Sequence, residues 1–226
     1  MTNYMDKKND EGYAGDPIDK GAVEPFEDMV ERLFKASGFH DKHAALMHAA
    51  IGISGEIGEL ALLRKVPMSM ARASYVEEIG DVRFYLSALG LIASKYYNCD
   101  KEANTACLSK AKMSCMSEVE LLLAMHHHAS ELLDLSKKSW VYGKEPEIAG
   151  IAVEAFRVME YLGEYQARLN ISTDEVMESN RIKLTGKQGR YVSGYSDESA
   201  QKRADKHEHI NNAKGDWTSP TVLGKV

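Results

Sequence analysis

A short motif occurs twice in this sequence, as Glu56-Ile57-Gly58-Glu59 and as Glu78-Ile79-Gly80-Asp81. Each copy places two acids three residues apart, which on a helix sets both carboxyl groups on one face, about one turn apart. Apolar residues flank both copies at helical spacing. They are Ala49, Ile53, Ile57 and Leu60 around the first copy, and Ile79, Val82, Leu86, Leu89 and Ala93 around the second. The pattern predicts two helices that pack antiparallel through these apolar stripes.

This packing would bring four carboxyl groups to one seam, those of Glu56, Glu59, Glu78 and Asp81. Desolvation and mutual repulsion both oppose the ionisation of acids that lie so close together. A cation is therefore expected at the seam, and carboxylate oxygens without thiol or imidazole partners suit Mg²⁺ or Mn²⁺. The alternative is a pair of solvated acidic helix faces. The repeated Ile-Gly between the acids favours the metal site.

The first helix also carries three glycines, Gly52, Gly55 and Gly58. Each glycine inside a helix costs roughly 1 kcal/mol relative to alanine. The apolar residues before and after them still favour a helix. We therefore expect a neighbouring backbone or a ligand to approach closely at these glycines.

Composition narrows the class of protein. The 226 residues are 44% apolar and 27% charged, which is ordinary for a soluble protein able to bury a core. A net charge of −6 without a basic cluster argues against nucleic acid or an anionic membrane as partner. No apolar run reaches the roughly 18 residues of a membrane span, and the polar start is no signal peptide. Cys99, Cys107 and Cys115 lack C-x-x-C spacing, so we expect free thiols in a cytoplasmic protein.

The whole chain is expected to be all-α, an antiparallel helical bundle without strands. Residues 1–24 form a flexible N-terminal arm, residues 25–195 the helical domain, and residues 196–226 a charged segment and tail. Cap and stop signals place the expected helices. They run from Pro25 to Ala36, from the cap Asp41 to before Pro67, from Ser69 or Ser74 to about Asn98, from Ser117 to Gly143, from Glu147 to Leu169, and from Ser172 to Gly186.

An internal duplication of a helical hairpin is possible, with residues 40–98 as the first copy and 117–170 as a degenerate second copy. In the second copy Arg157 stands where the first has Asp81, and a cation cannot bind a metal ion. We expect Arg157 to pair with Glu154 on the same helix face, leaving one metal cluster per chain. Chance similarity of two amphipathic helix pairs is the alternative. The remaining acids of the second copy are Glu131, Asp134 and Glu154.

The motifs resemble those of the MazG-like all-α nucleoside triphosphate pyrophosphohydrolases, which include dimeric dUTPases and dCTP pyrophosphatases. That superfamily has E-x-x-E, a spacer, and E-x-x-D. The surrounding residues match more specifically than the acids. The matching stretches are His48 to Glu56, Glu77 to Leu86, the inter-helix loop Lys137 to Lys144, and a phosphate-contacting segment at about 172–195 that holds Asn180 to Leu184, Arg190 and Tyr191.

The resemblance implies hydrolysis of a nucleoside triphosphate, expected to be a deoxynucleotide, to the monophosphate and pyrophosphate. Mg²⁺, or Mn²⁺ in its place, would be held by the four acids, which are also the catalytic residues, with Glu59 as the candidate base. The expected substrate contacts are Asn180, Lys183 and Arg190 for phosphate and His48 for the base. A homodimer is the expected assembly, in the cytoplasm, or in the host cytoplasm if the protein is viral.

Several alternatives remain at this point. The substrate could instead be phosphoribosyl-ATP or a guanosine alarmone, or the protein could be a metal-stabilised scaffold or nucleotide sensor without turnover. His40, His43, Tyr85 and Trp140 are further candidates for contact with a base. The run His126-His127-His128 cannot hold one ion, because adjacent helical residues diverge by about 100°.

Overall fold

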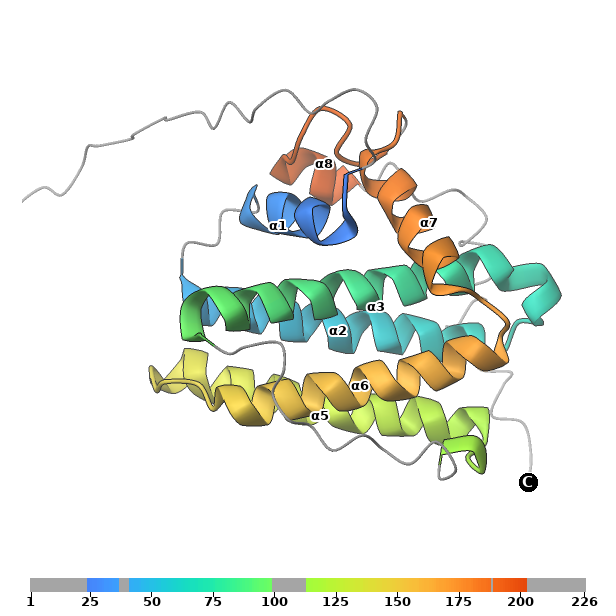
Figure 1. Cartoon of the computed structure of the whole chain (residues 1–226), viewed down its shortest axis with the longest axis horizontal. Coiled ribbons are helices and arrows are strands. Elements are labelled where there is room, and N and C mark those ends of the chain that lie inside the picture. The colour runs from blue at the N-terminus through green and yellow to red at the C-terminus, as the bar shows by residue number, and fades with distance from the viewer. Residues whose placement is uncertain (1–23, 37–40, 99–112, 188, 203–226) are drawn as a thin grey trace, which may run out of the picture.

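The computed structural model describes residues 24–36, 41–98, 113–187 and 189–202 (Figure 1). This part of the chain is all-helical and has no strand, as predicted. Its helices are α1 (Phe26–Ala36), α2 (Lys42–Leu63), α3 (Met68–Tyr97), α5 (Glu118–Tyr142), α6 (Ile148–Arg168), α7 (Thr173–Thr185) and α8 (Asp197–Lys202). The expected N-terminal arm up to residue 23 and the tail from residue 203 lie outside the described residues, as do Cys99 and Cys107. Cys115 is a free, exposed thiol.

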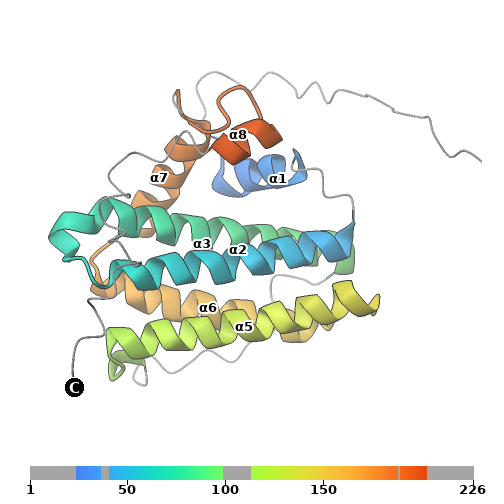
Figure 2. The ribbon, with the colours of Figure 1, turned by 180° about the vertical axis from the view of Figure 1, so that it is seen from behind.

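The helices form three layers (Figure 1). In the middle layer α2 and α3 make an antiparallel hairpin, and below it α5 and α6 make a second one. Seen from behind, α2 lies along α5 and joins the two hairpins (Figure 2). On the other side of α3 lie α1 and α7, with α8 near α1. Two hairpins are what the possible duplication requires, although the duplication itself stays a prediction.

The apolar stripes expected around the repeated motif form the centre of the core. On α2 all four residues of the stripe are completely buried, and on α3 only Leu86 remains half-buried. Burying a side chain of this size contributes roughly 1.5–3 kcal/mol, so packing of the hairpins outweighs the cost of the glycines in α2.

Helix α2 is the one described helix that is long and apolar enough to cross a membrane by length and composition. Its apolar side chains Ile53, Ile57 and Leu60 are buried inside the bundle instead. It also carries Glu56 and Glu59, which face other acids rather than lipid. These contacts place α2 in the core of the bundle.

The ends of most helices follow the sequence signals. Asp41 caps α2, its carboxylate accepting a hydrogen bond from the backbone of His43 at 2.9 Å, and Ser117 and Ser172 cap α5 and α7. The start of α3 was predicted wrongly. Its N-cap is Pro67, and Ser69 and Ser74 both lie inside the helix. Pro67 makes no side-chain cap, but its carbonyl accepts the hydrogen bond of Ala71 at 3.2 Å, and the missing N–H of a proline is no loss just before a helix. The short helix α8 was not predicted.

The glycines of α2 do not share one role. A Cβ atom added at Gly52 would lie 2.5 Å from the ring of Tyr85, so close approach is confirmed there. The same atom at Gly55 or Gly58 would meet nothing within 4 Å. No described residue therefore approaches Gly55 or Gly58 closely, and the approach of a ligand to these two glycines stays a prediction.

This difference leads to a matched pair of substitutions. Gly52→Ala forces the Tyr85 ring to move, and overpacking of this kind costs roughly 1–3 kcal/mol. Gly55→Ala adds a methyl group in open space and is expected to stabilise the helix by up to about 1 kcal/mol. Urea unfolding of both variants checks this. Equal effects of the two substitutions would contradict the assignment.

Candidate functional site

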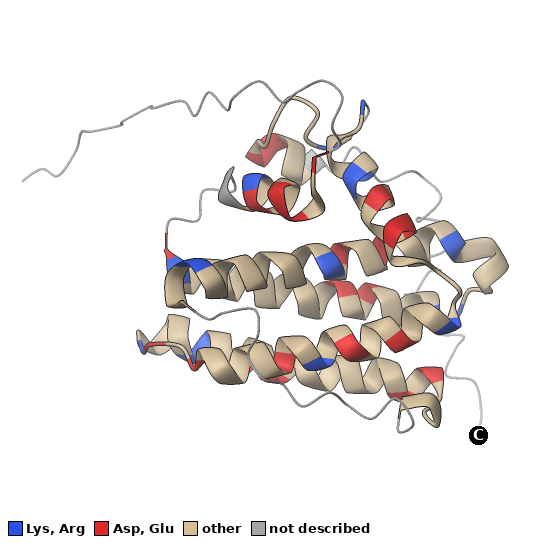
Figure 3. Ribbon diagram, viewed as in Figure 1, with Lys and Arg blue, Asp and Glu red and all other residues tan. Residues whose placement is uncertain are grey.

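Three acids of the repeated motif meet between the two helices of the first hairpin. Glu56 and Glu59 from α2 and Glu78 from α3 place one carboxylate oxygen each within 4.8 Å of one another. Figure 3 shows these acidic stretches of α2 and α3 (red) side by side beneath α7. No other group of three potential metal ligands occurs in the described part of the chain. The structure thus brings together three of the four acids expected at the seam.

Burial makes this cluster costly to ionise. Desolvation, followed by the charges of Glu56 and Glu59, raises the pKa of Glu78 to about 9. Desolvation, followed by the charges of Asp81 and Glu59, raises the pKa of Glu56 to about 7. Oxygen Oε2 of Glu56 is buried and has no hydrogen-bond partner. A divalent cation bound by these oxygens would give Oε2 of Glu56 a partner and would neutralise the negative charge of the ionised carboxylates. The residues therefore fit a hard metal ion.

The fourth acid, Asp81, is held by α7. Asn180 donates its amide hydrogen from Nδ2 to Oδ1 of Asp81 at 2.8 Å, and Lys183 donates from Nζ to Oδ2 at 2.5 Å. The same ammonium lies 3.1 Å from Oε1 of Glu77. Burial lowers the pKa of Lys183, but the two carboxylates outweigh it and the pKa is raised. Two of the three predicted phosphate contacts, Asn180 and Lys183, therefore bind a carboxylate in this structure.

The position of α7 follows from contacts with α3. A Cβ atom added at Gly80 would lie 3.1 Å from Cβ of Asn180, so glycine allows α7 to lie close against α3. Near the start of α7, Arg72 donates to the carbonyl of Asn170 at 3.1 Å and to the carboxylate of Glu175 at 2.8 Å. These contacts hold the helix that carries Asn180 and Lys183 over the acids.

A second anchor lies at the connection between α6 and α7. The buried side chain of Gln166 accepts a hydrogen bond from Arg83 at 2.8 Å. It donates to the carbonyl of Ile171 at 3.0 Å. This bridge joins α3 to the residues that precede α7, and it lies two residues after Asp81 on α3. The acids of the site therefore rest on packed helices rather than on a loop.

A cavity of about 320 Å³ opens beside the acids. Glu56 and Asp81 form part of its wall, and its other polar and aromatic residues come from α1, α2, α3 and the segment after α7. They are Phe34, His48, Phe84, Tyr85, Arg190, Tyr191 and Tyr195. Of the expected substrate contacts, His48 and Arg190 thus share one cavity with two of the expected acids.

Aromatic rings shape this cavity. The imidazole of His48 stacks on Phe34 with ring centroids 4.9 Å apart and meets the edge of Tyr85 at 5.7 Å. Burial lowers the pKa of His48, which favours the neutral ring. The guanidinium of Arg190 lies 5.9 Å from the ring centroid of Tyr191. An anionic group and a flat apolar group could therefore bind together in this cavity.

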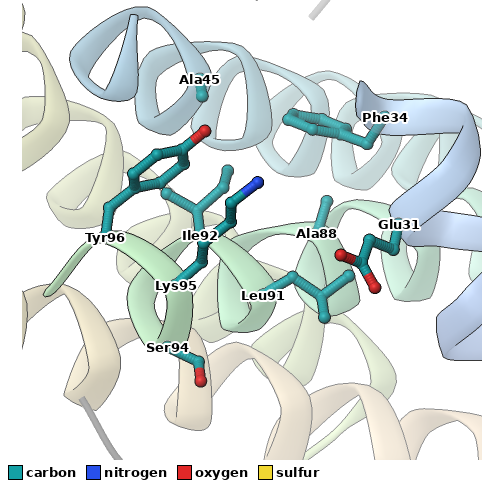
Figure 4. A pocket seen from close by; sticks show the side chains of 9 residues that line it. All are labelled: Glu31, Phe34, Ala45, Ala88, Leu91, Ile92, Ser94, Lys95 and Tyr96. Carbon is teal, nitrogen blue, oxygen red and sulfur yellow. The ribbon is translucent and has the colours of Figure 1, made fainter. Parts of the chain in front are cut away.

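A second cavity, of about 370 Å³, lies between α1, α2 and the end of α3 (Figure 4). Phe34 lines both cavities. The walls of the second one are mainly apolar, with Ala88, Leu91 and Ile92 facing the space and Glu31 and Lys95 beside them (Figure 4). It contains none of the expected site residues.

The other candidates for base contact lie elsewhere. Nδ1 of His43 is 2.6 Å from Oγ of Ser139, and neither lines the cavity beside the acids. Trp140 is 52% exposed at the end of α5. His40 lies outside the described residues. Among these candidates only Tyr85 lines the cavity.

The expected ion pair of the second hairpin was predicted wrongly. Arg157 lies 3.5 Å from Glu160, whereas Glu154 contacts Nδ1 of His128 at 2.7 Å. Glu154 lies three residues before Arg157 and Glu160 lies three residues after it. The side chain of His128, on α5, contacts Glu154. Asp134 pairs with two neighbouring lysines of its own helix. Two of the three acids left in this hairpin, Asp134 and Glu154, therefore have protein partners.

Sequence reasoning missed Glu77 and Phe34 as site residues. Glu77 is four residues before Asp81 on α3, so both carboxylates face Lys183. This spacing was visible in the sequence. Phe34 falls within the first expected helix, and only the packing of α1 shows that it borders both cavities.

Comparison of the chain with protein-family models, with curated proteins and with solved structures gives no match. The fold and the site define an all-helical bundle with a buried acidic cluster beside an aromatic cavity. A fold of this kind does not imply a function, so the function has to be argued from the site itself.

Proposed function

We propose that this protein is a Mg²⁺-dependent nucleoside triphosphate pyrophosphohydrolase. The observation that carries the proposal is the convergence of Glu56, Glu59 and Glu78 beside an aromatic cavity with a guanidinium in its wall. Such a substrate needs carboxylates that hold a hard metal ion, a cationic side chain that binds phosphate, and aromatic rings that stack on the base. The resemblance of the motifs to MazG-like enzymes supports the same reaction, and with it a dimeric, cytoplasmic protein.

The three glutamates would hold the metal ion, with Mn²⁺ as a possible substitute. A bound Mg²⁺ would neutralise negative charge on the triphosphate and favour attack by water on the α-phosphorus. Arg190 would donate to phosphate oxygens, since its planar guanidinium offers paired donors. His48 and Tyr85 would stack against the base. Glu59 is the proposed base that orients the attacking water.

The electrostatics favour an enzyme over a scaffold. Acids whose pKa values are displaced by burial and by one another, at the edge of a cavity, are typical of functional sites. A scaffold needs no cavity beside its metal ion. A guanosine alarmone or phosphoribosyl-ATP would use the same carboxylates, so these substrates belong in the same assay.

A substrate panel tests the proposal. We expect a deoxynucleoside triphosphate with Mg²⁺ to yield the monophosphate and pyrophosphate in equal amounts, and EDTA to stop the reaction. Chromatography of the nucleotides with a coupled assay for pyrophosphate measures both products. The panel contains the ribonucleotides, the deoxynucleotides, phosphoribosyl-ATP and an alarmone. Orthophosphate as the first product, or no turnover of any of them, would contradict the proposal.

A further inference from the structure

The ammonium of Lys183 already occupies the side of the acidic cluster formed by Glu77 and Asp81. Its side chain is only 10% exposed, and it lies 2.5 Å from one carboxylate and 3.1 Å from the other. The other oxygen of Asp81 accepts from Asn180. Both oxygens of Asp81 thus have a donor, whereas Oε2 of Glu56 has no hydrogen-bond partner.

Two cations at Asp81 repel each other strongly at such distances. An ammonium that contacts Oδ2 repels a divalent ion at the same carboxylate, and the low dielectric of a buried site strengthens the repulsion. The convergent oxygens of Glu56, Glu59 and Glu78 do not include those of Asp81. The glutamate triad can therefore bind a metal ion, whereas the charge of Asp81 is already neutralised by Lys183.

We propose that Lys183 is a built-in counter-ion that excludes metal from Asp81 until a substrate phosphate draws the ammonium away. The inference rests on the proposed function, in that the glutamate triad is taken to hold the first ion. Asp81 lines the same cavity as Arg190, so a phosphate bound there would lie near the ammonium. Asn180 would keep the carboxylate oriented after Lys183 leaves, because its own bond to Asp81 goes to the other oxygen.

The competing explanation is that Lys183 only fastens α7 to α3 and has no effect on metal binding. The two explanations differ in what happens when the charge is removed. If Lys183 excludes metal, its loss leaves the carboxylates of Glu77 and Asp81 without a counter-charge and creates a second ion site. If Lys183 only stabilises the packing of α7 on α3, the number of bound ions stays the same and only the free energy of unfolding changes.

Manganese binding to the full chain distinguishes them. The signal of free Mn²⁺ in electron paramagnetic resonance is measured during titration without nucleotide. We expect one bound ion in the native protein and two in Lys183→Met. Arg181→Met is the matched control, because Arg181 lies on the same helix and pairs with Glu178 at the surface. It is expected to bind one ion, as is Lys183→Arg, which keeps the charge.

Asp81→Asn gives a second test that does not depend on the folding of Lys183→Met. Without nucleotide, this variant is expected to bind one Mn²⁺ with an affinity within about threefold of the native protein. With a non-hydrolysable triphosphate analogue present, its Mn²⁺ affinity is expected to fall at least about tenfold, since Asp81 would then be a ligand.

The outcomes separate this inference from the proposed function. One ion in Lys183→Met, two ions in the native protein without nucleotide, or loss of the ion in Asp81→Asn would each overturn the role of Lys183. All three results leave metal-dependent hydrolysis intact. A native protein that binds no Mn²⁺ at all would overturn the inference and the proposed function together.

Discussion

Glu78→Gln is expected to abolish Mg²⁺-dependent release of pyrophosphate. Loss of a group that only supports a metal ligand typically costs 10- to 100-fold, so loss of a ligand should lower kcat/KM by more than about 100-fold. The side chain keeps its size and lies in the packed centre of the cluster, so the helical fold should persist. Steady-state kinetics and circular dichroism measure the two effects.

Glu131→Gln is the matched control for this variant, since Glu131 belongs to the second hairpin and lies outside the acid triad. It is expected to leave kcat/KM within about threefold of the native value. Glu56→Gln should behave like Glu78→Gln. Retained activity in both triad variants, or equal losses in the triad variants and the control, would contradict the assignment of the site.

The metal-free protein is expected to lose stability as the pH rises from about 5 to about 9. Glu56 and Glu78 keep their protons in the folded state up to about pH 7 and about pH 9, whereas the unfolded chain releases them near its ordinary value of 4.5. The folded state therefore binds more protons over this range, and the free energy of unfolding falls with pH. If the free energy of unfolding falls by about 2 kcal/mol over this range, Tm falls by roughly 4–8 °C.

Thermal unfolding in EDTA and in Mg²⁺ measures this dependence. Mg²⁺ binds the deprotonated carboxylates, so it should remove most of the fall and stabilise the protein more at high pH. Glu78→Gln serves as the control, because it lacks the acid with the higher pKa. It should show a flatter profile in EDTA and a higher Tm near pH 8. Parallel profiles for the native protein and this variant would contradict the buried, protonated cluster.

The sequence by itself determined six of the described helices and the meeting of three of the four expected acids. The 3.6-residue spacing of Ile53, Ile57, Ile79 and Val82 predicted which faces are buried, and each of these residues is completely buried. Capping residues marked most of the helix ends, because a cap acts on backbone groups within a few residues of itself. Local spacing along one helix is enough for predictions of this kind.

Only the tertiary structure decided the partners of charged groups that lie far apart in the chain. Lys183 is 102 residues from Asp81, and the sequence could not show that it binds this carboxylate. Arg157 has acids at i−3 and i+3. It pairs with Glu160, because Glu154 is bound by His128 from α5. The glycines of α2 look alike in sequence, yet only Gly52 meets a ring. Periodicity determines which face of a helix is buried, whereas the packing of distant helices determines what that face touches.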